Sequence, residues 1–321
     1  MTPRVVTLGE TMIQLSPGTD SLGKADALAV GIGGAESNLA CYLAASGTPV
    51  TWVSALGDDP FGDRVHAAVA AYGVEVSLAE HSHRSTGVYV KDPRPAGTRV
   101  HYYRSGSAAS ALSPVDLARM PLSGAGVLHL TGITPALSAS CADLVDAAMA
   151  TARAEGVVIS FDVNMRPSLW PDAATAANVL RRFARAADIV FVGRDEAEAL
   201  WGTPTADEIA AYLEVGHLVV KDGEVGATSF VAESDPVFVP APVVDVVEPD
   251  GAGDAFAAGY LRAMLGGAAE ADRLVEGHRF AALALGSHGD LPSPELVRAA
   301  LSGVGAGPVD GVTECGTAGA G

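Results

Sequence analysis

An alternation of strand-like and helix-like segments constrains the fold of this chain more than any other feature. Short apolar runs rich in β-branched residues, typical of buried strands, alternate with longer runs of helical spacing that mostly stop at glycine. The strand-like runs are residues 4–10, 49–57, 126–132, 156–164 and 188–193, and the helix-like runs are residues 36–47, 59–73, 138–155, 194–202 and one through Phe183. We therefore predict an α/β fold with a mostly parallel sheet, helices on both faces, and ligands at the carboxyl ends of the strands.

Two regions interrupt this alternation. Residues 85–93 and 98–108 are short alternating strands joined by a loop rich in Pro and Gly, which predicts a hairpin. Together with the extended segment from Met12 to about Val30, this hairpin is expected to form a small sheet that stands off the main domain and serves as a lid. Side chains alternate across a strand, so Tyr102 and Arg104 are predicted to share one face.

Composition excludes several classes of protein. The chain has 321 residues, 49% of them hydrophobic, and a net charge of -18, which argues against nucleic acid or an anionic membrane as a partner. Three cysteines without paired spacing fit a reducing compartment, and the sequence shows neither a leader nor a membrane span, so we expect a cytoplasmic protein. We predict one domain over residues 1–301, with the lid at about 12–30 and 84–107, and a disordered tail over residues 302–321.

The stretch "GAGDAFAAGY", residues 251–260, places a glycine turn at the predicted start of a helix. Successive amides of Gly251, Ala252, Gly253 and Asp254 would form an anion-binding cavity favoured by the helix dipole. A carboxylate at this point can accept a proton from a substrate hydroxyl. The alternative is an ordinary glycine turn in which Asp254 stabilises the first helical turn.

Five motifs in a fixed order resemble the ribokinase-like (PfkB) family of carbohydrate kinases. They are "GGAESNLA", "SALGDDPFGD", "DVNMRPSLW", "KDGEVG" and "GAGDAFAAGY", beginning at residues 33, 54, 162, 221 and 251, and the match continues to about Leu301. The resemblance implies a three-layer α/β/α core of nine strands with a small β lid. It also implies ATP-dependent phosphoryl transfer to a sugar hydroxyl, with Asp254 as the general base and the amides of residues 251–254 as the anion hole.

The resemblance assigns further residues to ATP and Mg²⁺. Those expected beside the nucleotide are Lys221, Gly223, Gly226, Gly251, Gly253 and His278. The alternatives are a plain hairpin turn at residues 221–226 and a helix-surface histidine at His278. Glu196 is expected to reach Mg²⁺ through water, although the asparagine that the family carries three residues earlier is here Gly193. Whether a monovalent cation activates the enzyme, and which nucleotide it prefers, stay open.

The substrate is expected to be a sugar acid. The resemblance places Gly34 and Asn38 against the sugar, and Gln14 stands where related kinases of neutral sugars often carry an aspartate that would repel an acid. The stretch "HYYRSGSAAS" resembles 2-keto-3-deoxygluconate kinases, which implies that the substrate is bound by Tyr89, Tyr102, Arg104 and Arg166. The implied reaction converts 2-dehydro-3-deoxy-D-gluconate to its 6-phosphate; acceptance of the galactonate-derived epimer is left open.

Two alternative functions remain. The nearest is a fructokinase or another sugar kinase of this fold, because "DVNMRPSLW" is also similar to fructokinases. The other, from a different class, is a noncatalytic nucleotide- or sugar-binding member of the fold. Arg104 and Arg166, taken singly, also fit structural salt bridges in so acidic a protein. Asp250 adds a negative charge beside the anion hole that the sequence does not explain. The edges of the lid sheet predict a homo-oligomer whose symmetry the sequence does not give.

Overall fold

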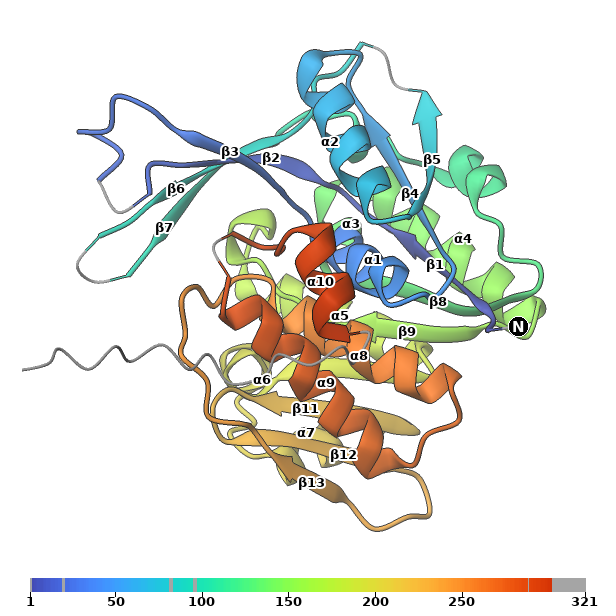
Figure 1. Cartoon of the computed structure of the whole chain (residues 1–321). Coiled ribbons are helices and arrows are strands. Elements are labelled where there is room, and N and C mark those ends of the chain that lie inside the picture. The colour runs from blue at the N-terminus through green and yellow to red at the C-terminus, as the bar shows by residue number, and fades with distance from the viewer. Residues whose placement is uncertain (1, 19–20, 81–82, 95–96, 288, 302–321) are drawn as a thin grey trace, which may run out of the picture.

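The computed structural model describes the whole chain except residues 1, 19–20, 81–82, 95–96, 288 and 302–321. The described residues form a large α/β body from which a smaller sheet projects (Figure 1). The predicted tail lies outside the described residues, so it stays a prediction, as does the domain boundary at residue 301. No helix among the described residues is long and apolar enough to cross a membrane.

The large sheet has nine strands in the order β13-β12-β11-β10-β9-β8-β1-β4-β5. The seven neighbouring strands β11, β10, β9, β8, β1, β4 and β5 pair in parallel. At the β11 edge, β12 and β13 are added in antiparallel pairing. Their bounds are β1 Arg4–Leu8, β4 Val50–Leu56, β5 Glu75–Glu80, β8 Ala125–Thr131, β9 Val158–Asp162, β10 Ile189–Gly193, β11 His217–Asp222, β12 Gly226–Val231 and β13 Val237–Pro240. The mostly parallel nine-stranded core that the sequence predicted is confirmed.

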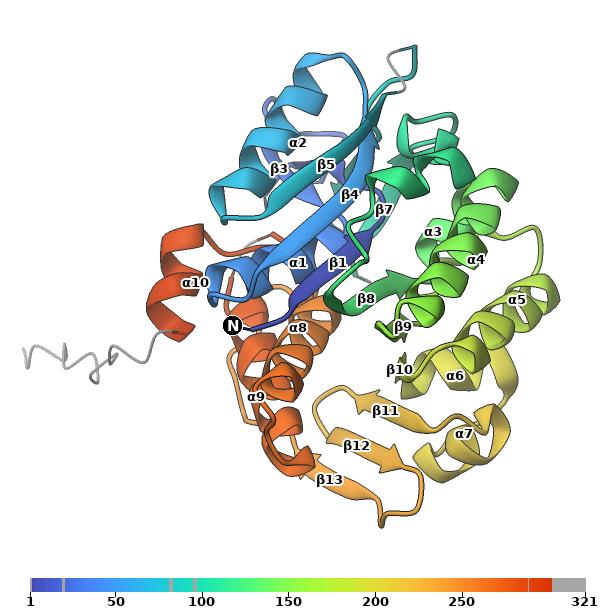
Figure 2. The same cartoon turned by 90° about the vertical axis from the view of Figure 1, so that its right-hand side faces the viewer.

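Helices cover both faces of this sheet, so its central strands are buried on both sides. Neighbouring residues of β1 belong to opposite cores: Val5 to a cluster that includes residues of α1, α2, α8, α9 and α10, and Val6 to one that includes residues of α4, α5, α6 and α7. Figure 2 shows these two groups of helices on opposite faces of the sheet. The helices are α1 Ala35–Ala45, α2 Pro60–Ala71, α3 Ile133–Leu137, α4 Ala139–Ala154, α5 Ala173–Ala186, α6 Arg194–Trp201, α7 Ala206–Leu213, α8 Ala252–Leu265, α9 Glu270–Leu285 and α10 Pro294–Leu301. The predicted three-layer arrangement is therefore present.

The projecting sheet has four strands in the order β3-β2-β6-β7. Its strands are β2 Met12–Ser16, β3 Ala29–Gly33, β6 Val88–Asp92 and β7 Arg99–Tyr103. The predicted hairpin is the antiparallel pair β6 and β7, in which Tyr89 lies opposite Tyr102. This sheet crosses the carboxyl end of β1 (Figure 1). The lid expected from the sequence thus exists as a separate layer, and it stands over the edge of the main sheet where ligands are expected.

Candidate active site

The glycine turn before α8 delivers Asp254 to the first turn of that helix, as predicted. Gly251 is the N-cap and has a φ of 77°, in the left-handed region that favours glycine. A Cβ on Gly251 would lie 2.5 Å from the backbone oxygen of Asp290. Both the backbone conformation and the lack of space therefore require glycine here. Gly251 and Asp254 both line one cavity, and the first amides of a helix have no partner within the helix.

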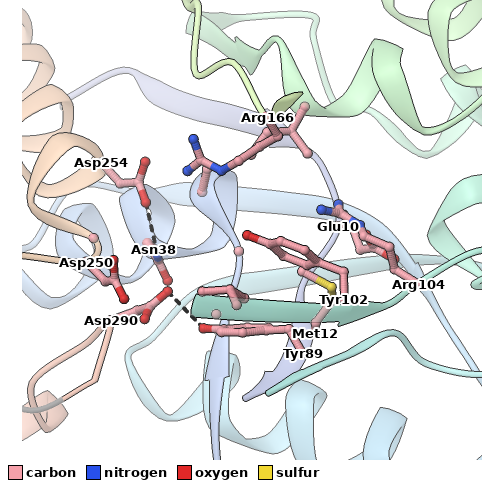
Figure 3. A pocket seen from close by; sticks show the side chains of 16 residues that line it. Glu10, Met12, Asn38, Tyr89, Tyr102, Arg104, Arg166, Asp250, Asp254 and Asp290 are labelled. Carbon is pink, nitrogen blue, oxygen red and sulfur yellow. Dashed lines mark hydrogen bonds and ion pairs between the residues drawn. The ribbon is translucent and has the colours of Figure 1, made fainter. Parts of the chain in front are cut away.

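Two asparagine amides hold the carboxylate of Asp254. Asn38 donates from Nδ2 to Oδ2 at 2.9 Å (Figure 3). Asn164 donates from Nδ2 to Oδ1 at 3.2 Å. Asn164 follows β9 and has a φ of 39°, an uncommon conformation for a residue other than glycine. Backbone strain of this kind gathers at functional sites. The sequence analysis quoted the stretch that contains Asn164 but did not assign it a role.

The surroundings of Asp254 raise its pKa toward neutral pH. Loss of hydration is the largest cause and raises the pKa of Asp254 to about 7, the nearby charge of Asp162 adds to the rise, and the hydrogen bond from Asn38 and the charges of Arg166 and Lys221 oppose it. A general base works best when its pKa lies near the operating pH. Asp254 is therefore a candidate for a base that acts at neutral pH.

A pH profile tests this assignment. Only the ionised carboxylate accepts a proton, so kcat/KM is expected to fall as the pH drops through about 7, not near the pKa of 3.8 of an ordinary aspartate. Asn164→Gly keeps the left-handed backbone but removes a hydrogen bond to the charged carboxylate, so the fall should move to higher pH. The measurement is kcat/KM from pH 5 to 9 for both proteins. Activity that stays level down to pH 5 would show that Asp254 is not the titrating base.

All the residues predicted to bind the sugar line one cavity beneath the lid. They are Gly34, Asn38, Tyr89, Tyr102, Arg104, Arg166 and Asp254. Asp254 and Asn38 lie on one side of the cavity, and Glu10 and Arg104 lie on the other (Figure 3). Val100 also lines the cavity, which agrees with the predicted alternation along β7. Gln14 is buried on β2 beside Tyr89 of β6 and is not among the lining residues, so its effect on substrate choice stays a prediction.

Arg104 makes the structural ion pair that the sequence analysis kept as an alternative. Its Nε donates to Oε2 of Glu10 at 2.6 Å, and Ser107 donates to the other oxygen of the same carboxylate. The Arg104 guanidinium also lies 5.7 Å from the centre of the Tyr102 ring. Glu10 follows β1 and is buried, and the sequence analysis missed it. Arg104 lines the cavity, and both its Nε and its Nη2 contact the Glu10 carboxylate.

Lys221 lies beside the anion hole and not only at a hairpin turn. Its Nζ donates to Oδ2 of Asp162 at 2.6 Å and would be 3.3 Å from a Cβ placed on Gly253. Burial opposes the charged amine, but the attraction of Asp162 outweighs it and raises the pKa of Lys221. The ammonium is therefore charged and faces the turn. Asp162, the last residue of β9, is a further residue that the sequence analysis did not assign.

Glu196 is a partly buried carboxylate in the first turn of α6. Its two oxygens accept hydrogen bonds from the backbone amides of Met165 and Gly193. Desolvation, followed by repulsion from Asp162, raises the pKa of Glu196. Oδ1 of Asp162 is buried and has no hydrogen-bond partner among the described residues. An oxygen of this kind, with a second carboxylate close by, fits the hydration shell of a divalent cation.

The other predicted nucleotide residues lie apart from this cavity. Gly223 and Gly226 form the turn of the β11–β12 hairpin, which is confirmed. His278 is buried in α9, where its Nε2 lies 3.1 Å from the carbonyl oxygen of Val239 and its ring meets Phe256 edge to face. The alternative that His278 is a helix-surface histidine is therefore wrong. Contact of these three residues with a nucleotide stays a prediction.

Asp250, beside the glycine turn before α8, has a cationic partner. Its Oδ2 lies 2.8 Å from Nζ of Lys91 on lid strand β6, which accounts for the charge that the sequence left unexplained. Lys91 also contacts Asp290. Neither residue was predicted from the sequence. No local pattern marks Lys91, because its partners are more than 150 residues away.

Known proteins resemble the chain along nearly its whole length. The model of the pfkB family carbohydrate kinases matches residues 2–296. A 2-dehydro-3-deoxygluconokinase of Bacillus subtilis is 37% identical over 307 residues, covering 92% of this chain and 95% of that protein. A 2-dehydro-3-deoxygalactonokinase of Haloferax volcanii is 34% identical over 323 residues, covering 96% and 99%.

The fold leads to the same group of proteins. The crystal structure of a 2-dehydro-3-deoxygluconokinase from Thermotoga maritima superposes with a TM-score of 0.82 at 25% identity, over 94% of this chain and 99% of that one. The ribokinase-like fold predicted from the motifs is confirmed. Motifs, family model and structure agree, and the chain belongs to the pfkB family of carbohydrate kinases.

Proposed function

We propose that this kinase transfers the γ-phosphoryl group of ATP to the terminal hydroxyl of 2-dehydro-3-deoxy-D-gluconate and forms the 6-phosphate. One observation supports this most strongly: a carboxylate whose pKa is raised to about 7, Asp254, shares a cavity with two arginines, Arg104 and Arg166. A base at one end and cations within the same cavity suit a substrate with a hydroxyl at one end and a carboxylate at the other.

The chain supplies three parts of the reaction. Asp254 takes the proton of the sugar hydroxyl as that oxygen attacks the γ-phosphorus. The amides of Gly251, Ala252, Gly253 and Asp254 stabilise the charge on the migrating phosphoryl group, and the ammonium of Lys221 lies beside them. Gly34, Asn38 and Tyr89 hold the sugar. Tyr102 and Arg104 bind the carboxylate end, and Arg166, whose guanidinium lies on the side of Asp254 (Figure 3), also binds the substrate.

ATP with Mg²⁺ is the proposed phosphoryl donor. Gly223, Gly226 and His278 would contact the nucleotide. Asp162, through its unpaired Oδ1, and Glu196 would hold the waters of Mg²⁺. The ion would neutralise the phosphate charge when bound. Omission of Mg²⁺ should abolish turnover, and a comparison of potassium with choline chloride tests activation by a monovalent cation.

Two further properties belong to this proposal. We expect a homo-oligomer, because the lid strand β7 at the sheet edge exposes 68% of Tyr103. Light scattering after gel filtration measures its size. We also expect a cytoplasmic enzyme that uses no nucleic acid or membrane partner, since Cys41 and Cys141 are free and the chain is strongly acidic.

A substrate panel tests the function. ADP release is followed for 2-dehydro-3-deoxy-gluconate, its galactonate epimer, fructose and ribose. The proposal requires turnover of one or both keto acids well above that of the neutral sugars. Turnover of fructose alone would favour the fructokinase alternative, to which the Arg104–Glu10 pair lends support because it already occupies the arginine. Tight ATP binding without transfer to any sugar would favour a noncatalytic member of the fold.

A further inference from the structure

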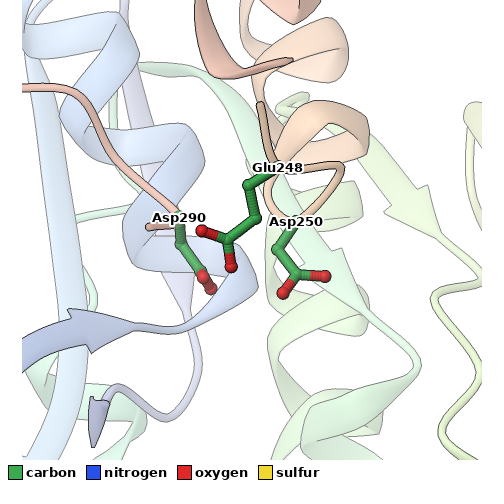
Figure 4. Close-up of side chains that lie close together, drawn as sticks. All are labelled: Glu248, Asp250 and Asp290. Carbon is green, nitrogen blue, oxygen red and sulfur yellow. The ribbon is translucent and has the colours of Figure 1, made fainter. Parts of the chain in front are cut away.

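Three carboxylates meet next to the anion hole. Glu248 and Asp250 precede the Gly251 turn, and Asp290 lies between α9 and α10 (Figure 4). One oxygen from each lies within 4.8 Å of the others, a spacing that would suit a metal ion. Three negative charges so close together repel one another and would also repel the phosphates of ATP. The cluster therefore needs a positive charge of its own.

Lys91 supplies that charge from the lid. Its side chain leaves β6 and is buried, with only 3% of the residue exposed. Nζ donates to Oδ1 of Asp290 at 3.0 Å, lies 2.8 Å from Oδ2 of Asp250, and also donates to Oε1 of Glu248. Burial opposes the charged form, but Asp290, Asp250 and Glu248 outweigh it and raise the pKa of Lys91. The ammonium thus takes the place among the carboxylates that a bound cation would take.

The same cluster connects the lid to the catalytic turn. The Tyr89 hydroxyl, two residues before Lys91 on the same face of β6, donates to Oδ2 of Asp290 at 3.0 Å. The second oxygen of Glu248 accepts the amide of Gly289 at 2.7 Å. The backbone oxygen of Asp290 packs against Gly251, close enough to exclude a Cβ there. A shift of Asp290 would therefore move both a sugar-binding residue and the start of the anion hole.

We propose that Lys91 is a positioning residue for phosphoryl transfer, which offsets part of the negative charge of the Glu248–Asp250–Asp290 cluster and docks the lid against the anion-hole turn. The inference rests on the proposed function. Loss of the ammonium would increase the net negative charge where the phosphates of ATP approach and would release β6 from the turn. ATP binding and turnover should then both suffer, and a replacement cation should restore them in part.

The variants are chosen to separate charge from packing. Lys91→Ala removes the ammonium and leaves space among the carboxylates, and Lys91→Arg keeps a cation. Lys24→Met, at an exposed lysine between β2 and β3, is the matched control. For Lys91→Ala we expect KM for ATP to rise and kcat to fall, with kcat/KM reduced about 10²-fold. The reason is that removing the lysine leaves the charges of its carboxylate partners without a counter-charge. Lys91→Arg should retain most activity, and Lys24→Met all of it.

Cation rescue is the decisive measurement. Relative to choline chloride of equal ionic strength, ammonium or potassium chloride should raise kcat/KM of Lys91→Ala several-fold more than it raises kcat/KM of the wild type. Wild-type kinetics in Lys91→Ala would overturn the proposal, as would a loss that no small cation relieves in a variant with wild-type thermal unfolding. Binding of a nonhydrolysable ATP analogue is measured by calorimetry under the same salts. If the wild type phosphorylates no sugar, these binding data still test Lys91, so the two failures are distinguishable.

Discussion

Asp254→Asn should lower kcat by about 10²- to 10⁴-fold, the usual worth of general-base catalysis. The amide keeps the shape of the side chain but cannot accept the proton of the sugar hydroxyl. KM for ATP should change little, because the anion hole consists of backbone amides that the substitution leaves in place. Steady-state kinetics of purified protein with the keto acid and ATP provide the measurement.

The control for Asp254→Asn is Asp207→Asn, which alters an exposed aspartate in the first turn of α7. It should have wild-type kinetics. Burial makes the charged form of Asp254 costly, as its raised pKa shows, so Asp254→Asn should not lower the temperature of unfolding. An equal loss of ATP affinity and kcat would assign Asp254 to nucleotide binding and not to proton transfer.

Arg104→Ala should raise KM for the keto acid about 10²-fold and leave KM for ATP nearly unchanged. Truncation removes charge-assisted hydrogen bonds to a substrate carboxylate, which are among the strongest polar contacts. It also leaves Glu10 buried without its ionic partner, and an unpaired buried charge destabilises a protein. The single variant therefore mixes lost binding with lost structure.

A double variant separates these effects. Glu10→Gln with Arg104→Ala removes both charges, so the unpaired carboxylate is gone. If Arg104 binds the sugar acid, the double variant should recover thermal stability while KM for the keto acid stays high. Recovery of KM as well would mean that Arg104 serves only as the partner of Glu10. Turnover of fructose, measured in parallel, should respond little to either variant.

The sequence predicted the parts of this molecule that depend on local patterns. Alternating strand and helix segments gave the sheet, and glycine at residue 251 gave the turn that begins α8, because backbone conformation there is set by a single residue. Alternation along β7 placed Tyr102 and Arg104 on one face, as the cavity confirms. These features need only neighbouring residues to be recognised.

Local patterns could not predict contacts between residues that are distant in the sequence. Asn164 orients Asp254 across 90 residues, and Lys91 joins Glu248 across 157. Their roles follow from the order of the strands and the placement of the lid, which a single sequence does not specify. Asp250 was an unexplained charge for the same reason. Its partner lies on another layer of the fold.

A crystal structure with 2-dehydro-3-deoxy-gluconate and a nonhydrolysable ATP analogue would test the central claim most directly. We predict that the terminal hydroxyl of the sugar lies within hydrogen-bond reach of Asp254, about 2.6–3.2 Å. The γ-phosphate analogue should face the amides of residues 251–254, and the sugar carboxylate should contact Arg104. A hydroxyl bound instead by Asp290 or Asp250, with Asp254 out of reach, would contradict the proposed mechanism.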